Sequence, residues 1–66
     1  MSFAYRCFFF TRDRKISGSR DIHASSDAEA IAAAKALAVE HNAPAFELWE
    51  GTRYLHGEAT ARPKQP

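Results

Sequence analysis

The alternation of apolar and polar positions predicts two strands, one helix and two further strands. Apolar side chains dominate residues 3–11, and a charged stretch at 12–15 separates them from a loosely alternating segment at 16–24. Residues 45–50 and 53–57 form a second pair of alternating segments on either side of a turn. A period of two is typical of strands, and short polar connections are typical of antiparallel hairpins. The pattern predicts an α+β fold of order ββαββ, in which one helix packs on an antiparallel sheet of about four strands.

The helix is predicted between the hairpins, where a capping box precedes an alanine-rich segment. The Ser26 hydroxyl can accept a hydrogen bond from the backbone N–H of Glu29, whose carboxylate can reach back to the cap. The segment continues to about His41 and cannot pass Pro44. At about 100° per residue, one stripe of this helix is apolar and should face the sheet. Its members are Ala30, Ile31, Ala34, Leu37 and Ala38.

The first strand carries large apolar side chains on both of its sides. Consecutive strand residues point to opposite faces, so Phe8, Phe9 and Phe10 cannot all face one helix. On the simplest alternation, the helix-facing set is Phe8, Phe10, Ile16, Ile22, Phe46 and Leu48. The other face then carries an interface formed by Tyr5, Cys7, Phe9 and Trp49. Because one helix covers only one face, we expect a second copy of the chain to cover the other, giving a homodimer.

Length and composition predict one small domain. A chain of 66 residues is near the lower limit for a single hydrophobic core. We place the domain at residues 1–58. Residues 59–66 contain two prolines and no large apolar residue, and are predicted to be a disordered tail. Within the domain, Gly18 predicts a bulge in the second strand and an edge position for that strand.

The single cysteine and the lack of a long apolar segment predict a cytoplasmic protein. Cys7 has no partner for an internal disulfide and is expected to act as a small buried apolar residue. Arg6 interrupts the first apolar run, so we expect no secretory signal. No segment approaches the roughly 20 apolar residues of a membrane span.

No arrangement of reactive residues predicts an enzyme, a cofactor site or a metal site. The spacing of His23, His41 and His56 matches no ligand signature, and we expect His41 to interact with the end of the helix. The serines lack a nucleophile motif, and Ser26 is expected to cap the helix. We therefore expect a non-enzymatic interaction protein without cofactor or metal.

Binding of single-stranded nucleic acid is the alternative that these residues leave open. Basic residues cluster in and near the first hairpin loop, and the open sheet face presents aromatic rings on which bases can stack. The basic set is Arg12, Arg14, Lys15 and Arg20. Acidic residues at 47, 50 and 58 and a net charge of only +1 oppose this alternative.

The order of motifs resembles a group of very short alphaproteobacterial proteins that share an E-L-W-x-G segment near the C-terminus. Here that segment is Glu47-Leu48-Trp49-Glu50-Gly51, and the likeness extends over residues 3–57, including the aromatic first strand and the Asp27-Ala28-Glu29-Ala30 helix start. The group has no assigned activity. The resemblance therefore implies an architecture and a bacterial cytosolic setting, and it implies no site residues.

Overall fold

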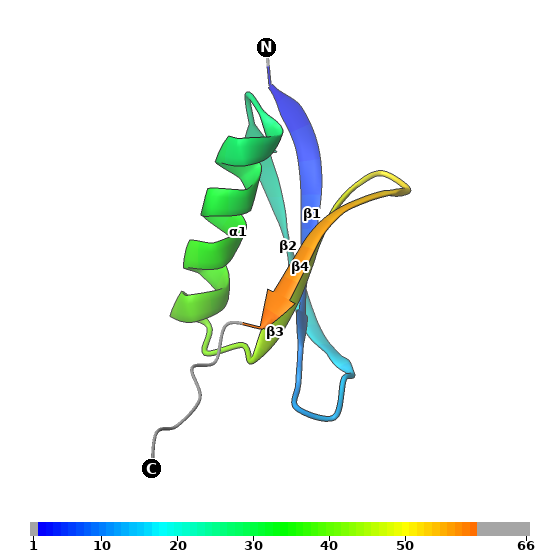
Figure 1. Ribbon diagram of the computed structural model, residues 1–66, viewed down its shortest axis with the longest axis vertical. Helices are drawn as coiled ribbons and strands as arrows, with labels where there is room; N and C mark the ends of the chain where they lie inside the picture. Colours follow the sequence, from blue (N-terminus) through cyan, green and yellow to red (C-terminus); the bar gives the residue numbers. More distant parts are fainter. Residues whose placement is uncertain (1, 60–66) are drawn as a thin grey trace.

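The computed structural model describes residues 2–59 and has the predicted order of elements (Figure 1). The bounds of the elements are β1 (Phe3–Phe10), β2 (Ile16–Ala24), α1 (Asp27–Glu40), β3 (Ala45–Glu50) and β4 (Arg53–Ala59). All strand pairs are antiparallel, and the order across the sheet is β2-β1-β3-β4. The predicted α+β fold is confirmed. Residues 60–66 of the predicted tail lie outside the described residues, whereas Ala59 ends β4.

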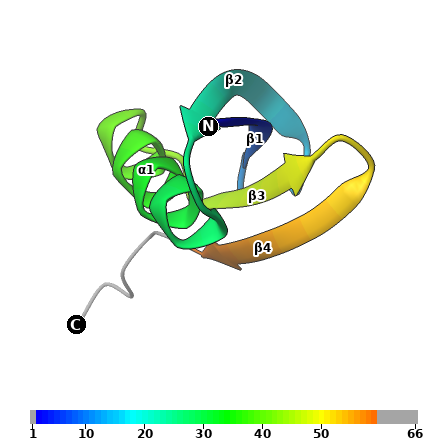
Figure 2. The ribbon, with the colours of Figure 1, turned by 90° about the horizontal axis from the view of Figure 1, so that it is seen from above.

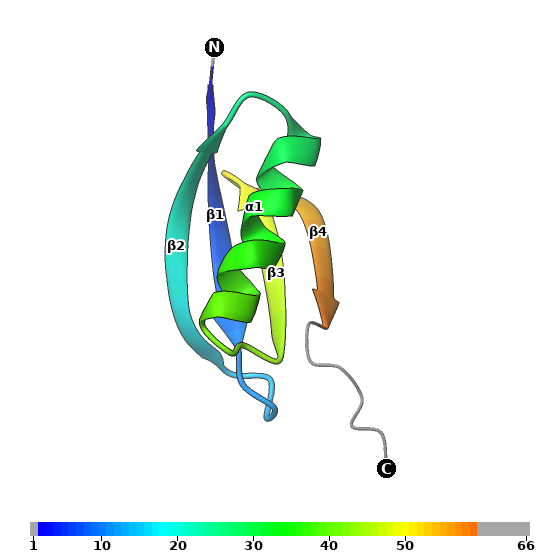
Figure 3. The same cartoon turned by 90° about the vertical axis from the view of Figure 1, so that its left-hand side faces the viewer.

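The helix lies along one side of the sheet and divides it into two unlike faces. Figure 3 shows α1 in front of the central strands, with β2 and β4 at the two edges. Figure 2 shows that the sheet is strongly twisted and that no second layer stands opposite α1 among the described residues. We call the side against α1 the covered face and the other side the open face. No helix within residues 2–59 is long and apolar enough to cross a membrane.

The core lies between α1 and the covered face, and alanines allow the two layers to approach closely. Ala30, Ala34 and Ala38 are fully buried, and the larger Ile31 and Leu37 pack at the margin of the core, which confirms the predicted apolar stripe. The sheet supplies most of the large side chains of the core. Its buried side chains are Tyr5, Cys7, Phe9, Ile22, Ala24, Phe46 and Leu48.

The alternation predicted for β1 is wrong by one residue. Cys7 lies opposite Leu48 in the β1–β3 ladder and Phe9 lies opposite Phe46, so these side chains share the covered face. Phe8 and Phe10 therefore lie on the open face. The physical reason is visible in Arg6, which has the same parity as Phe8: turning Phe8 inward would also turn this charge toward the apolar core without a partner.

Ile16 also lies on the open face, against the prediction, because a bulge shifts the parity of β2. Phe9 is opposite Gly18 whereas Phe10 is opposite Ile16, so Ser17 is the extra residue in the ladder. The Ser17 hydroxyl lies 3.4 Å from the Phe9 carbonyl oxygen and donates a hydrogen bond to it. The bulge and the edge position that Gly18 predicts for this strand are confirmed.

The N-terminus of α1 is held by its cap and by a contact with the sheet. The Glu29 backbone N–H donates to the Ser26 hydroxyl over 3.1 Å, as predicted. The Glu29 carboxylate accepts hydrogen bonds from the backbone and hydroxyl of Ser25, which lower the Glu29 pKa. From the sheet, the Tyr5 hydroxyl donates to Asp27 Oδ1 over 2.8 Å, tying β1 to the first residue of the helix.

The second hairpin is longer than predicted and contains its own irregularity. Leu48 is opposite His56 whereas Trp49 is opposite Tyr54, so Leu55 is the extra residue. The strand then continues two residues beyond Gly57, to Ala59. Tyr54 consequently lies on the open face with Trp49.

Candidate functional site

The open face carries an uncovered group of aromatic side chains, and we call Phe8, Phe10, Trp49 and Tyr54 the aromatic patch. The strands place them: the first two follow from the parity of β1, and the last two are opposite each other in the β3–β4 ladder. Phe8, Phe10 and Trp49 are half-buried, and Tyr54 is 52% exposed. Ile16, opposite Phe10 on β2, extends the patch and is 59% exposed.

One ring contact and one glycine set the position of Tyr54. Its ring meets that of Trp49 edge to face, with centroids 5.4 Å apart and an interplanar angle of 72°, a favourable aromatic geometry. The Trp49 indole N–H donates to Glu47 over 3.2 Å. A Cβ atom at Gly57 would lie 2.4 Å from the Tyr54 hydroxyl oxygen. Tyr54 therefore lies across Gly57, and a side chain at that position would displace it.

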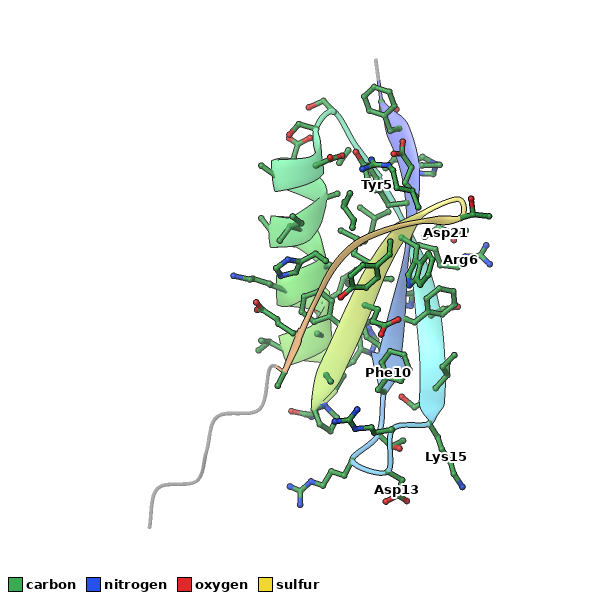
Figure 4. The ribbon with its side chains drawn as sticks, turned by 45° about the vertical axis from the view of Figure 1, so that its right-hand side comes forward. Tyr5, Arg6, Phe10, Asp13, Lys15 and Asp21 are labelled. Atoms are coloured by element: carbon green, nitrogen blue, oxygen red, sulfur yellow. The ribbon has the colours of Figure 1, made fainter. Side chains whose placement is uncertain are left out.

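An ion pair borders the aromatic patch on the β1–β2 side. Arg6 Nε lies 2.9 Å from Asp21 Oδ1, and both side chains are more than half exposed. Figure 4 shows Arg6 and Asp21 projecting away from α1, whereas Tyr5 points toward it. The pair contributes little to stability because water screens it. It does balance the charge beside the patch.

The loop between β1 and β2 is an ordered turn with basic side chains. The Thr11 N–H donates to the Lys15 carbonyl over 2.8 Å and closes the hairpin, and the Arg14 N–H donates to the Thr11 carbonyl over 2.9 Å. The Thr11 hydroxyl accepts from the backbone N–H groups of Asp13 and Lys15. Arg14 has a φ of 66°, a left-handed conformation that glycine adopts at lower cost.

A groove on the open face joins this loop to the aromatic patch. It has a volume of about 500 Å³ and runs over the β3–β4 side of the sheet, next to the hairpin loop. Its lining includes Phe10, Arg12, Arg14, Ala45, Tyr54 and Gly57, together with the acidic Glu47 and Glu58. The groove thus combines aromatic residues, small residues, two arginines and two carboxylates.

The predicted interface residues do not come together on the open face. Tyr5, Cys7 and Phe9 are almost fully buried on the covered face, so their assignment to the uncovered side is wrong. Trp49 does lie on the open face. Phe8, Phe10 and Tyr54 lie on the open face in their place, and the predicted helix-facing positions of Phe8 and Phe10 are wrong. The signal for Phe8 was the charge of Arg6, two residues earlier on the same side.

The predicted basic set is divided by the structure. Arg12 and Arg14 line the groove, and Lys15 belongs to the same loop without lining it. Arg20 is opposite Cys7 in the β1–β2 ladder, so it lies toward the covered side at the edge of β2. There it lines a separate hollow with His41, away from the groove.

The titratable groups Cys7 and Tyr5 on the covered face are buried and have raised pKa values. Burial raises the pKa of Cys7 from its ordinary 9.0 to about 11, so the thiol stays protonated and poorly nucleophilic at neutral pH. Burial, and next the hydrogen bond to Asp27, raise the pKa of Tyr5 to about 12. Among the described residues, no cluster of three or more histidine, cysteine or carboxylate side chains could hold a metal ion.

Comparison with known proteins gives no family or relative: the chain matches no protein-family model, and no curated protein or solved structure matches it significantly. The resemblance to short alphaproteobacterial proteins stays a prediction.

Proposed function

We propose that this chain is a non-enzymatic interaction module that forms a homodimer through its open face. The observation that carries the proposal is the aromatic patch together with Ile16, over which no helix or loop lies within residues 2–59. Contiguous apolar side chains of this size are uncommon on the free surface of a small soluble monomer and mark contact sites.

The small size of the core supports an additional contact surface. Apart from alanines, the side chains buried by one helix are few, and a domain of this length buries a low fraction of its surface. Burying a second aromatic layer would add apolar contacts at about 25 cal/mol per Å². Such a gain is large for a domain whose total stability is small.

Charge favours a second copy as the occupant of the open face. Arg6 and Asp21 form an internal pair, so this border of the patch has no net charge to repel an identical surface. A two-fold contact also lets each copy use the same apolar residues, as closed homodimers do. For the setting, we propose the cytoplasm, since Cys7 is a buried free thiol.

Sedimentation equilibrium of the full chain over a micromolar concentration range tests the proposal. We expect a species of twice the 7.4 kDa chain mass. Trp49→Lys should give a folded monomer, because it places a charge in the middle of the contact. Val39→Lys is the matched control, since Val39 is 64% exposed on α1, away from the open face. A wild-type chain that stays monomeric throughout this range contradicts the proposal.

A further inference from the structure

The groove is open to solvent and has a volume in the range of small ligand sites. Its volume of about 500 Å³ falls within the roughly 300–1,000 Å³ of sites that hold small molecules. Phe10 and Tyr54 supply ring surface, and Ala45 and Gly57 add no large side chain to the lining. Rings beside a floor of small residues favour a flat aromatic ligand.

The charges at the loop end of the groove are open to a ligand. Within residues 2–59, neither Arg12 nor Arg14 forms an ion pair with a carboxylate. Two carboxylates, Glu47 and Glu58, also line the groove, and each has a hydrogen-bond or ion-pair partner of its own. Glu47 accepts the indole N–H of Trp49, and Glu58 pairs with Lys35 over 3.6 Å and with His56 over 3.2 Å. Lys35 offsets the charge of Glu58, whereas the indole N–H orients the Glu47 carboxylate and leaves its charge in the groove.

The backbone of the loop adds an independent observation. Arg14 occupies the left-handed position of a tight hairpin turn, where glycine avoids a steric cost. Residues held in such conformations concentrate at sites where the side chain has a role. Arg14 lines the groove, so its guanidinium is the feature that a glycine would remove.

We propose that the groove binds a nucleotide, with the base against Phe10 and Tyr54 and the phosphate on Arg12 and Arg14. Guanidinium groups bind phosphate oxygens through paired, charge-assisted hydrogen bonds, and bases stack on aromatic rings. The same chemistry is offered by a free nucleotide and by one unit of a single strand. One chain forms the whole groove, but Phe10 and Tyr54 also belong to the aromatic patch, so a bound nucleotide competes with the proposed homodimer for this face.

Calorimetric titration of the full chain with three probes tests the inference. The probes are inorganic phosphate, adenosine monophosphate and an eight-nucleotide single strand of thymidylate. We expect adenosine monophosphate to bind at least about tenfold more tightly than phosphate, because only it offers a ring to the groove. If the single strand is the natural source, it should bind more tightly still, with an affinity that falls steeply with salt. Failure of both nucleotide probes to exceed phosphate overturns the inference.

Two loop variants separate the groove from general positive charge. Arg14→Gly should weaken binding of the better nucleotide probe by about tenfold or more, since a charge-assisted contact is lost. Lys15→Ser removes the same charge from the same loop outside the groove, and should weaken binding by less than about threefold. Circular dichroism checks that both variants fold. Equal losses in the two variants mean nonspecific attraction and overturn the inference.

Discussion

The two faces of the sheet use similar residues for opposite purposes, and β1 shows this within two neighbouring positions. Phe9 is 5% exposed beneath α1, whereas Phe8 is half-buried on the open face, where no element of residues 2–59 covers it. The side chains are identical and adjacent. Their different environments come from the parity of the strand and the position of the helix, so hydrophobicity alone does not assign a residue to a core.

The largest expected effect is the difference between two matched substitutions in β1. Phe9→Ala removes a ring from the closed core and should lower the free energy of unfolding by about 3–5 kcal/mol, a large share of the stability of a small domain. Phe8→Ala should lower it by about 1 kcal/mol or less in dilute solution, because that ring is only half-buried. Urea unfolding followed by circular dichroism measures both.

The dependence of stability on protein concentration gives a second test with the same two variants. If the open face forms the proposed homodimer, wild-type stability rises with protein concentration, and Phe8→Ala should reduce that rise. A Phe8→Ala variant as unstable as Phe9→Ala at low concentration would contradict the contrast between the faces.

Alkaline pH should lower the stability of the fold through two buried groups on the covered face. Cys7 has an ordinary pKa of 9.0 and a folded pKa of about 11, so above pH 9 the unfolded chain releases a proton that the folded chain retains. Stability is therefore fully present below pH 9 and declines as pH rises toward 11. Tyr5 adds a decline between pH 10 and about 12. Urea midpoints across this range measure the loss.

The control for the alkaline prediction is Cys7→Ala. This variant is less stable at neutral pH because it leaves a cavity, but its midpoint should fall less steeply above pH 9. Identical slopes for the wild type and the variant would show that the thiol does not contribute to the decline.

A smaller effect is expected at the helix cap on which the covered face depends. Ser26→Ala removes the hydroxyl that accepts the Glu29 N–H and should cost about 1 kcal/mol. Ser26→Asp should retain most of the stability, because its carboxylate can accept the same hydrogen bond. Thermal unfolding compares the two, and equal losses would contradict a capping role.

The smallest expected effect is in the hairpin loop beside the groove, where a substitution should stabilise the fold. Arg14→Gly should raise the free energy of unfolding by about 0.5–1 kcal/mol, because glycine adopts the left-handed backbone conformation without steric cost. Lys15→Gly, which has no such backbone requirement, should not stabilise the fold. A destabilised Arg14→Gly variant would mean that the loop adopts another turn in solution.

Local sequence signals were sufficient to predict the helix and the strands, but they did not predict which residues form the open face. The capping box at Ser26 and Glu29 located the helix start, and the predicted bounds of β2 and β3 agree with the structure. The open face could not be assembled in the same way. The placement of Ile16 and Tyr54 depends on the bulges at Ser17 and Leu55, each of which reverses the parity of the residues beyond it.

The sequence by itself determined the order of the elements, the apolar stripe of α1 and the excess of aromatic residues over what one helix covers. These properties depend on neighbouring residues and on periodicity. Only the tertiary structure decided which rings are covered and that Arg12 and Arg14 meet Phe10 and Tyr54 in one groove. The reason is that strand register is set by pairing between distant segments, and a shift of one residue moves every side chain to the opposite face.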